Sequence, residues 1–180
     1  MRILALDPGS AKSAWVLLKD GVPIEFAIDD NESILDFVVK PLDDCHRTIE
    51  MMKARGMPTA NEELMTCVWI GRFMQASGHP WTFVYRQDVK LHLCGRVTAS
   101  DANIRCALID RYGGKDTAIG GVKCKYCKGK GWYGNGRPTC PVCKGEKWLH
   151  PPGPLHGLHA DLWQALAVAV TFVDQQEATS

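Results

Sequence analysis

Short apolar runs alternate with turn residues over the first 28 positions. One run covers 3–6 and ends in Asp7-Pro8-Gly9-Ser10, a second covers 13–18, and Asp20-Gly21 separates it from a third at 23–28. An Asp-Gly pair between two apolar runs is a strong short-range signal of a two-residue β-hairpin. The pattern therefore predicts three consecutive antiparallel strands.

Two helices are expected between the third strand and residue 76. Asn31 precedes a short helical stretch at 32–39, and Asn61 precedes a longer one that ends near Ala76, with a loop at 56–59 before it. Asparagine directly before such a stretch is typical of a helix N-cap. Large apolar residues at helical spacing predict the buried face of the longer helix: Leu64, Met65, Val68, Trp69 and Phe73.

The remaining pattern mixes two strands with three helices. Apolar runs at 46–52 and 81–85 predict a fourth and a fifth strand, and helical patterns cover 87–93 and 100–112. The last stretch, 158–174, is apolar almost all round, which is typical of a helix buried against a sheet. Three strands in a row, followed by strands that alternate with helices, predict an α/β fold with one mixed sheet covered on both faces.

Composition places the chain among globular proteins. Its 180 residues are 46% hydrophobic and 23% charged, which disfavours disorder, collagen-like repeats and coiled coils and suits one domain. The longest apolar run, 165–170, is far shorter than the roughly 20 residues that span a bilayer. An acid as early as Asp7 argues against a secretory signal. We therefore expect no membrane association and a cytoplasmic location.

Charge is distributed unevenly although the net charge is only +1. Residues 123–150 carry seven lysines and arginines against one acid, Glu146, which gives this segment +6 and leaves the rest of the chain at −5. A basic block beside an acidic remainder favours an appendage that faces a polyanion.

Four of the eight cysteines form a repeat inside this basic segment. The first copy, Cys-Lys-Tyr-Cys-Lys-Gly-Lys-Gly-Trp at 124–132, recurs at 140–148 as Cys-Pro-Val-Cys-Lys-Gly-Glu-Lys-Trp. Two residues between cysteines let one turn direct two thiolates to a common point, and two such turns complete a tetrahedral zinc site. Because so short a segment buries little apolar surface, we expect it to fold only when zinc binds. The predicted ligands are Cys124, Cys127, Cys140 and Cys143.

The repeat resembles the Cys-x-x-Cys-x-Gly-x-Gly repeats of the DnaJ chaperone zinc domain, except that Lys147 stands where the last glycine of the second copy would be. From this resemblance we take one zinc ion per pair of repeats. A pair of disulfides is an alternative, but nothing else in the sequence indicates an oxidising compartment. The other four cysteines are interpreted as small buried hydrophobes: Cys45, Cys67, Cys94 and Cys106.

Three acids stand where carboxylates are costly. Asp7 ends the first predicted strand, Glu50 lies within the fourth, and Asp161 lies near the start of the last helix. Buried carboxylates are normally neutralised, paired or bound to a metal. If the three converge, their oxygens suit Mg²⁺ or Mn²⁺. The ordinary alternatives are a turn residue, a strand-edge acid and a helix cap, respectively.

The order of these parts resembles the RuvC-type Holliday-junction resolvases, and in particular the compact RuvC-like nucleases of bacteriophages. The resemblance covers about 1–115 and 155–175. It implies an RNase H-like fold, in which a five-stranded mixed sheet has the order 3-2-1-4-5 and the acids gather where strands 1 and 4 lie side by side. It also implies homodimers that cut a four-way junction symmetrically, in a bacterial or phage-infected cell. The segments that carry it are Asp7-Pro-Gly-Ser10, Thr48-Ile-Glu50, 85–90, 99–104 and 161–169.

Carried over by position, Asp7, Glu50 and Asp161 match the metal-binding acids of that family. The cellular resolvases have a second acid one helical turn after the last of these, and here Gln164 holds that place. An amide oxygen offers a lone pair but no charge, which puts the second metal site in question. His159 is an auxiliary ligand or base on one interpretation and an exposed residue at the helix start on the other.

Contacts to DNA are expected on both parts of the chain. Lys90 and Arg96 could hold phosphate on the body, although such residues are ordinarily solvated surface charges. Aromatic residues among the lysines of the basic segment, including Trp148, could stack on unpaired bases or pack against the zinc site. The predicted DNA-binding residues of the segment are Lys125, Lys128, Lys130, Arg137, Trp132 and Tyr133.

These features together predict a metal-dependent endonuclease that cleaves branched DNA by two-metal phosphodiester hydrolysis, with Mg²⁺ or Mn²⁺ and Zn²⁺ as cofactors. One alternative is a non-catalytic branched-DNA-binding protein of the same fold, and another is a zinc module that docks proteins. The expected organisation is a nuclease core over 1–120 and 153–180, interrupted before the last helix by a zinc-binding basic insertion at 121–152.

Overall fold

The computed structural model describes residues 1–42, 44–53, 60–134 and 138–178. The chain divides into two compact units: the first combines Met1–Ala107 with His159–Ser180, and the second is Leu108–Leu158. Within the described ranges, no helix is both long and apolar enough to cross a membrane. The loop predicted at 56–59 lies outside the described residues.

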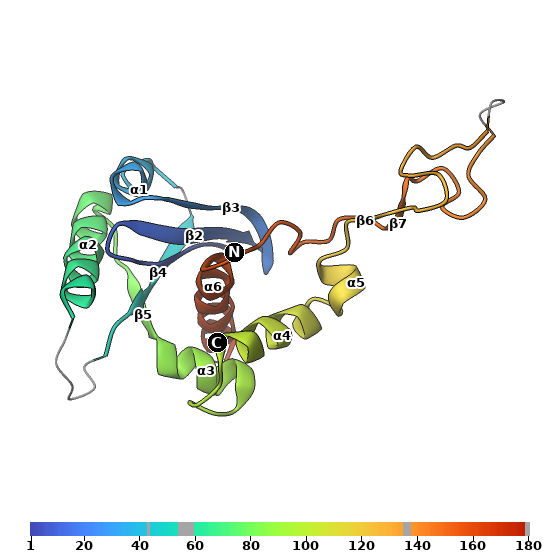
Figure 1. The fold of residues 1–180 in the computed structure, drawn as a ribbon. Coiled ribbons are helices and arrows are strands. Elements are labelled where there is room, and N and C mark those ends of the chain that lie inside the picture. The colour runs from blue at the N-terminus through green and yellow to red at the C-terminus, as the bar shows by residue number, and fades with distance from the viewer. Residues whose placement is uncertain (43, 54–59, 135–137, 179–180) are drawn as a thin grey trace. The chain divides into compact units, whose positions relative to one another are not determined.

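The first unit is built on a five-stranded sheet (Figure 1). Three antiparallel strands come first, and Asp20 and Gly21, with φ of 50° and 78°, form the turn between the second and third. Two further strands add in parallel beside the first, which gives the order β3-β2-β1-β4-β5 and confirms the predicted order. The strands are β1 (Arg2–Asp7), β2 (Lys12–Lys19), β3 (Val22–Asp30), β4 (Cys45–Met51) and β5 (Thr82–Tyr85).

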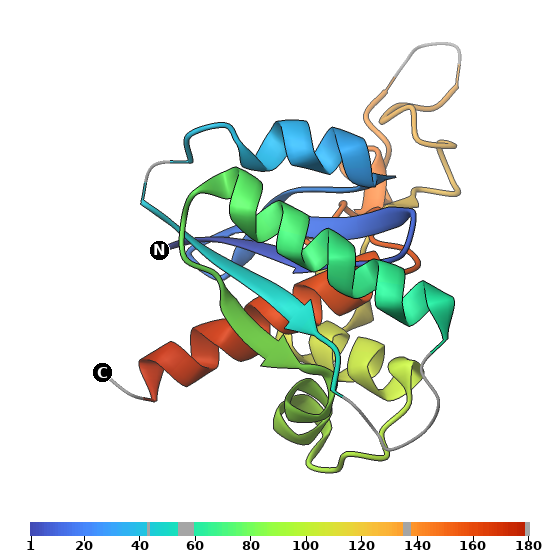
Figure 2. The ribbon, with the colours of Figure 1, turned by 90° about the vertical axis from the view of Figure 1, so that its left-hand side faces the viewer.

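Helices cover both faces of the sheet, as the sequence predicts. Two of them, α1 and α2, lie side by side on one face (Figures 1 and 2) and enclose an apolar core with Leu6, Ile49 and Phe73. On the other face α6 packs against β1, β2 and β4, and residues 162–173 of this helix are all buried. The helices of this part are α1 (Asn31–Val38), α2 (Asn61–Ser77), α3 (Arg86–Cys94), α4 (Asp101–Arg111) and α6 (Leu162–Glu177).

The prediction that Asn31 caps the first helix is wrong. The N-cap is Asp30, and Asn31 is the first helical residue. Its buried side chain accepts a hydrogen bond from Ser13 Oγ (2.6 Å) and donates one to the carbonyl oxygen of Gly9 (3.0 Å). Asn31 therefore ties α1 to the turn that follows β1.

The predicted capping and buried face of α2 also need correction. The N-cap is Ala60 rather than Asn61, and Leu64, Met65 and Val68 are about half exposed. At about 100° per residue, Leu64 and Val68 lie on the opposite side of the helix from the residues that touch the sheet. The buried face consists of Thr66, Trp69, Ile70, Phe73 and Ser77.

The last helix begins at Leu162, four residues later than predicted. Ala160 has a positive φ of 43°, which a helix cannot contain, so 158 and 159 are irregular and 160 and 161 form a turn before the helix starts. The interpretation of the scattered cysteines as buried hydrophobes is likewise wrong, because none of them is fully buried: Cys67 and Cys106 are exposed, and Cys45 and Cys94 are partly exposed.

The second unit has little regular structure. It contains α5 (Lys115–Ala118) and a two-stranded antiparallel sheet of β6 (Val122–Lys123) and β7 (Trp148–His150). This small sheet pairs the two ends of the basic segment. Neither α5 nor these strands were predicted, since elements of two to four residues carry no hydrophobic periodicity.

Candidate functional site

Asp7 and Glu50 lie at the carboxyl ends of neighbouring parallel strands. The last register pair of β1 and β4 is Leu6 with Ile49, so the next position on each strand brings Asp7 beside Glu50. Side chains alternate along a strand, and Leu6 and Ile49 face the core under α1 and α2. Asp7 and Glu50 therefore point to the opposite face, which α6 covers.

The first turn of α6 contributes polar side chains to the same face. Asp161 is the N-cap of this helix, and Gln164 follows one turn later with only 7% of its surface exposed. The pKa of Asp7 responds to the charge of Asp161, so the two carboxylates are close enough to interact.

Arg86 joins these residues into one network. This first residue of α3 follows directly after β5, whose carboxyl end lies at the same edge of the sheet as that of β4. Its Nη1 lies 3.4 Å from Glu50 Oε2 and also donates a hydrogen bond to Gln164 Oε1. Its Nη2 donates to Asp101 Oδ1 in the first turn of α4. One guanidinium thus contacts two acids and the amide.

Arg86 and Asp101 are site residues that the sequence did not predict. Arg86 lies in the polar stretch Arg-Gln-Asp-Val-Lys, which is typical of an exposed helix, and Asp101 is an ordinary first-turn acid. The position of Arg86 in the chain could have identified it, because it directly follows a strand that is parallel to the strand of Glu50. In such sheets functional residues gather outside the carboxyl ends of the strands.

The carboxylates of the site repel one another. Burial raises the pKa of Asp7 well above its ordinary value, Glu50, Asp161 and Asp101 raise it further, and Arg86 opposes the rise. Burial also raises the pKa of Glu50, against the attraction of Arg86 and Lys90. Four acids against one bonded guanidinium leave an excess of negative charge, the condition that a bound cation relieves.

The donor set suits a hard divalent cation, because carboxylate and amide oxygens are the ligands that Mg²⁺ and Mn²⁺ prefer. In the described part of the chain, the four cysteines are the one group of potential metal ligands whose donor atoms all lie close together, within 4.8 Å of one another. The acids share a neighbourhood but are spread around Arg86. The arrangement is therefore a cluster of acids with an arginine among its oxygens.

The other predicted body residues lie at varying distances from this network. Lys90 is half-buried on α3 and lowers the pKa of Glu50 by its charge. Arg96 is exposed and its Nη2 lies 3.4 Å from Asn103 Oδ1, so it stabilises the start of α4. His159 is exposed in the turn before α6, where its carbonyl accepts a hydrogen bond from the Leu162 amide.

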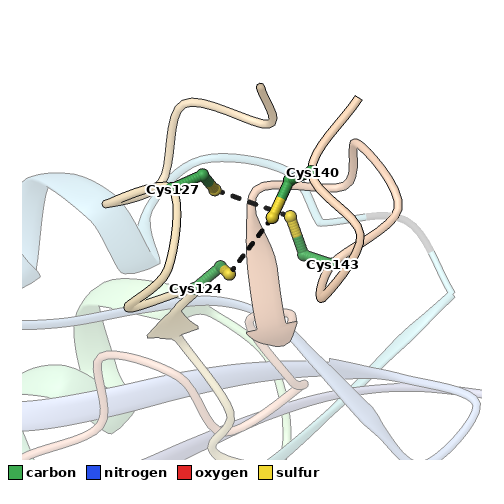
Figure 3. A group of neighbouring side chains, drawn as sticks. All are labelled: Cys124, Cys127, Cys140 and Cys143. Carbon is green, nitrogen blue, oxygen red and sulfur yellow. Dashed lines mark hydrogen bonds between the residues drawn. The ribbon is translucent and has the colours of Figure 1, made fainter. Parts of the chain in front are cut away.

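The four paired cysteines converge in the second unit (Figure 3). Their sulfur atoms lie within 4.8 Å of one another, with 3.8 Å between those of Cys124 and Cys140 and 3.6 Å between those of Cys127 and Cys143. A tetrahedron of sulfurs at a Zn–S distance of about 2.3 Å has edges of about 3.8 Å. A disulfide would instead need about 2.05 Å. The cluster has the dimensions of a zinc site and not of two disulfides.

Backbone geometry explains how each Cys-x-x-Cys turn is made. The Gly131 amide donates a hydrogen bond to Cys127 Sγ (3.3 Å). Burial alone would raise the pKa of Cys127, but this hydrogen bond and those with the neighbouring thiols lower it to about 6. Burial and the hydrogen bonds with Cys127 and Cys140 raise the pKa of Cys143 to about 11. Lys147 stands in the second copy at the place that Gly131 holds in the first, and both residues have a positive φ, 71° for Lys147 and 84° for Gly131. The substitution in the second copy thus changes the residue and not the turn.

Aromatic residues of the segment divide into two groups. Trp132 and Trp148 are half-buried, and the ammonium groups of Lys130 and Lys123 lie over their rings at 5.2 Å and 5.8 Å. Tyr126 and Tyr133 are exposed and meet edge to face at 5.5 Å. Packing explains the tryptophans, and the two tyrosines are the rings available to a partner. Lys125, Lys128 and Lys130 are exposed, and Arg137 lies outside the described residues.

Comparisons with known proteins identify the fold. No protein-family model matches the sequence, and no curated protein matches it. RuvC from Thermus thermophilus is structurally similar, with a TM-score of 0.60, 15% sequence identity, and coverage of 99% of this chain and 97% of that chain. RuvC of the same organism in complex with a Holliday junction substrate gives a TM-score of 0.56 at 15% identity, with coverage of 99% and 96%. The chain therefore has a RuvC-like fold, with the cysteine cluster before its last helix.

Proposed function

We propose that this protein is a metal-dependent endonuclease that cleaves branched DNA such as Holliday junctions. The observation that carries the proposal is the convergence of Asp7, Glu50 and Asp161 from separate segments at one edge of a RuvC-like sheet. The solved RuvC complex with a Holliday junction supports the choice of substrate class.

Asp7, Glu50 and Asp161 would hold Mg²⁺ or Mn²⁺. When bound, these ions activate a water molecule and stabilise the charge that develops on the phosphate during phosphodiester hydrolysis. Asp101 supplies a fourth carboxylate through its bond to Arg86, and so offsets the charge missing at Gln164. Arg86 reduces the repulsion among the acids and orients Glu50, and Lys90 is close enough to Glu50 to pair with a DNA phosphate beside it.

The second unit would bind DNA as a zinc-stabilised module. Cys124, Cys127, Cys140 and Cys143 fit one Zn²⁺ in number, burial and spacing. Four thiolates around Zn²⁺ carry −2, so the segment of +6 keeps about +4 for contacts with phosphates. Tyr126 and Tyr133 offer exposed rings for stacking on unpaired bases.

The protein would act as a homodimer, because two matched cuts in a four-way junction need two sites. The exposed apolar residues Leu64, Met65 and Val68 on α2 support this, since a soluble monomer rarely exposes such a stripe without a partner. Their helix covers the sheet on the face opposite the acids, so a dimer through α2 leaves both acid clusters accessible.

A cleavage assay on a synthetic four-way junction with Mg²⁺ or Mn²⁺ tests the proposal. Asp7→Asn, Glu50→Gln and Asp161→Asn should each lower cleavage on the order of 10²-fold or more while leaving junction affinity within a few-fold. Asp36→Asn, an exposed acid on α1, is the matched control and should cleave at the wild-type rate. Wild-type rates in all three site variants would contradict the assignment.

A non-catalytic protein that binds branched DNA is the second candidate. Gln164 favours it, because an uncharged amide bonded to Arg86 stands at the place of an acid. This candidate predicts tight binding of four-way junctions by the wild-type protein and no cleavage of several branched substrates with either metal. The same gel and a binding titration therefore separate the two candidates.

A further inference from the structure

A cavity of about 530 Å³ opens at the beginning of β4, at the end of this strand away from the acids. Its described walls come from the segment that leads into β4 and from His79, which follows α2. A smaller cavity of about 210 Å³ adjoins it and shares Cys45, His46, Arg47 and His79. Nothing in the proposed nuclease mechanism uses this region.

Arg47 is the unusual residue of both cavities. Only 5% of its surface is exposed. Its Nη1 lies 3.4 Å from the carbonyl oxygen of Cys45, but Nε and Nη2 are buried without a hydrogen-bond partner in the structure as described. Asp44, the acid in the described wall, is exposed and forms no ion pair with it. A buried guanidinium with two unsatisfied donors costs several kcal/mol, and proteins normally pair such groups.

The two unsatisfied nitrogens form a specific binding edge. Nε and Nη2 lie on the same side of the planar guanidinium, and their parallel N–H groups match two oxygens of one phosphate or carboxylate. His79 adds an exposed imidazole donor to the cavity wall, whereas the His46 ring lies on the opposite face of the sheet, 5.9 Å from the ring of Phe172 on α6. Arg47 lines the cavity, but Nε and Nη2 are covered by the protein, so binding requires the side chain to rotate and turn this edge toward the ligand.

This cavity is separate from the acid cluster. Arg47 and Glu50 are three residues apart on β4, which places them about 10 Å apart along the strand and on opposite faces of the sheet. Arg47 shares its face with Ile49 and the core beneath α1 and α2, whereas Glu50 faces α6. A ligand of Arg47 would therefore not occupy the metal-binding site.

We infer that this cavity binds a small phosphate-bearing molecule through Arg47 and His79. The volume lies in the range of small-molecule sites, about 300–1,000 Å³, and holds inorganic phosphate or a mononucleotide. Phosphate is favoured over a carboxylate because its additional oxygens can also accept from the His79 imidazole. A small molecule is favoured over a DNA backbone because Nε and Nη2 are covered, and a ligand must fit inside the cavity to meet them when the side chain rotates.

Thermal unfolding of the full-length zinc-bound protein tests this inference, with inorganic phosphate and adenosine 5′-monophosphate as the probes. At 100 times its Kd, either ligand should raise the wild-type Tm by about 5–10 °C, beyond the effect of potassium chloride at equal ionic strength. Arg47→Met should abolish the rise and should itself increase the phosphate-free Tm, since it removes an unpaired buried charge. Arg72→Met, which removes an exposed arginine paired with Glu32, should keep the full response.

His79→Ala provides a second variant, because His79 is exposed and its loss should weaken phosphate binding several-fold without unfolding the protein. The inference is overturned if phosphate and the nucleotide leave the wild-type Tm unchanged up to 50 mM. It is also overturned if Arg47→Met and His79→Ala respond as the wild type does. A larger Arg47-dependent rise with a short DNA duplex than with either small ligand would assign the site to DNA instead.

Discussion

Burial at single residues determines the electrostatics of the acid cluster. Asp7 and Glu50 are both desolvated, and both lie near other acids, so the pKa of each carboxyl is higher in the folded protein than its ordinary value. The pKa of Asp20, an exposed acid, shifts in the opposite direction: a hydrogen bond from the terminal amino group lowers it. The sign of the effect on stability follows directly from these directions.

Asp7→Asn is predicted to stabilise the metal-free protein at neutral pH. The pKa of Asp7 is higher in the folded than in the unfolded chain, so its contribution to stability is lost as the pH rises from its ordinary value through the folded-state value. We expect a Tm at least about 2 °C above the wild type at pH 7, the effect of about 1 kcal/mol in a chain of this size.

The gain from Asp7→Asn should vanish below the ordinary aspartate pKa, where both states are protonated. Thermal melts with chelator between pH 3 and pH 8 measure it. Asp20→Asn is the matched control and should not raise the Tm at any pH, because the pKa of Asp20 is lowered on folding. A stability difference that is independent of pH would contradict the electrostatic explanation for Asp7.

Arg86→Met is predicted to make the first unit more dependent on divalent cations. Without the guanidinium, Glu50 and Asp101 lose their bonded cation and the acids repel one another more strongly. Because the pair of Arg86 with Glu50 is largely buried, we expect its loss to lower the free energy of unfolding without metal by about 3–5 kcal/mol. Adding Mg²⁺ should then raise the Tm of the variant more than that of the wild type. Arg72→Met is the control, since its ion pair with Glu32 is exposed. An equal response to Mg²⁺ in wild type and Arg86→Met would place the metal elsewhere.

At the scale of elements, α2 illustrates how a helix can present two apolar faces. One face contacts the sheet through Trp69, Ile70 and Phe73, and the other exposes Leu64 and Val68. Hydrophobic periodicity identifies the helix but does not say which of two apolar stripes meets the sheet. That choice depends on which stripe fits the surface formed by β4 and α1.

Val68→Lys is predicted to dissociate the proposed homodimer without unfolding the protein. Val68 is 52% exposed on α2, so a lysine there adds charge to an interface and none to the core. Sedimentation at several concentrations should give a dimer for the wild type and a monomer for the variant, with an affinity loss of at least about 10-fold. Ile24→Lys, a matched change at an equally exposed apolar residue of β3 (52%), should remain dimeric. A monomeric wild type at all concentrations would contradict the proposed role of this stripe.

At the scale of the whole molecule, the division of labour between the two units is testable. The acids, Arg86 and Arg47 all belong to the first unit, and the four cysteines belong to the second. The second unit has short strands and the core of four cysteines, so its stability should depend on zinc, whereas that of the first should not.

Deletion of 123–150, with the flanking glycines and prolines joined, is predicted to leave the first unit folded and to weaken junction binding. The deletion removes a charge of +6, so the slope of log affinity against log salt should flatten by about 0.9 for each phosphate that the protein no longer neutralises. Fluorescence titrations at several salt concentrations measure both quantities. Unchanged affinity and slope would favour a protein-docking role for this segment, and elemental analysis that finds no zinc in protein purified without chelator would contradict the metal site.

The sequence by itself determined the features that are encoded over short distances. Alternating apolar residues and Asp20-Gly21 specify the first three strands, and the paired Cys-x-x-Cys repeats specify the cysteine cluster, since each turn needs only four consecutive residues. The apolar run of α6 likewise identifies a helix that must be buried on every side.

Only the tertiary structure decided which distant residues meet. Arg86 and Gln164 are 78 positions apart, and they come together because β5 ends beside β4 while α6 crosses the same edge of the sheet. The unpaired guanidinium of Arg47 is equally invisible in the sequence, where Cys-His-Arg-Thr is an ordinary polar start of a strand. Contacts between segments depend on strand order and helix placement, and no local pattern carries that information.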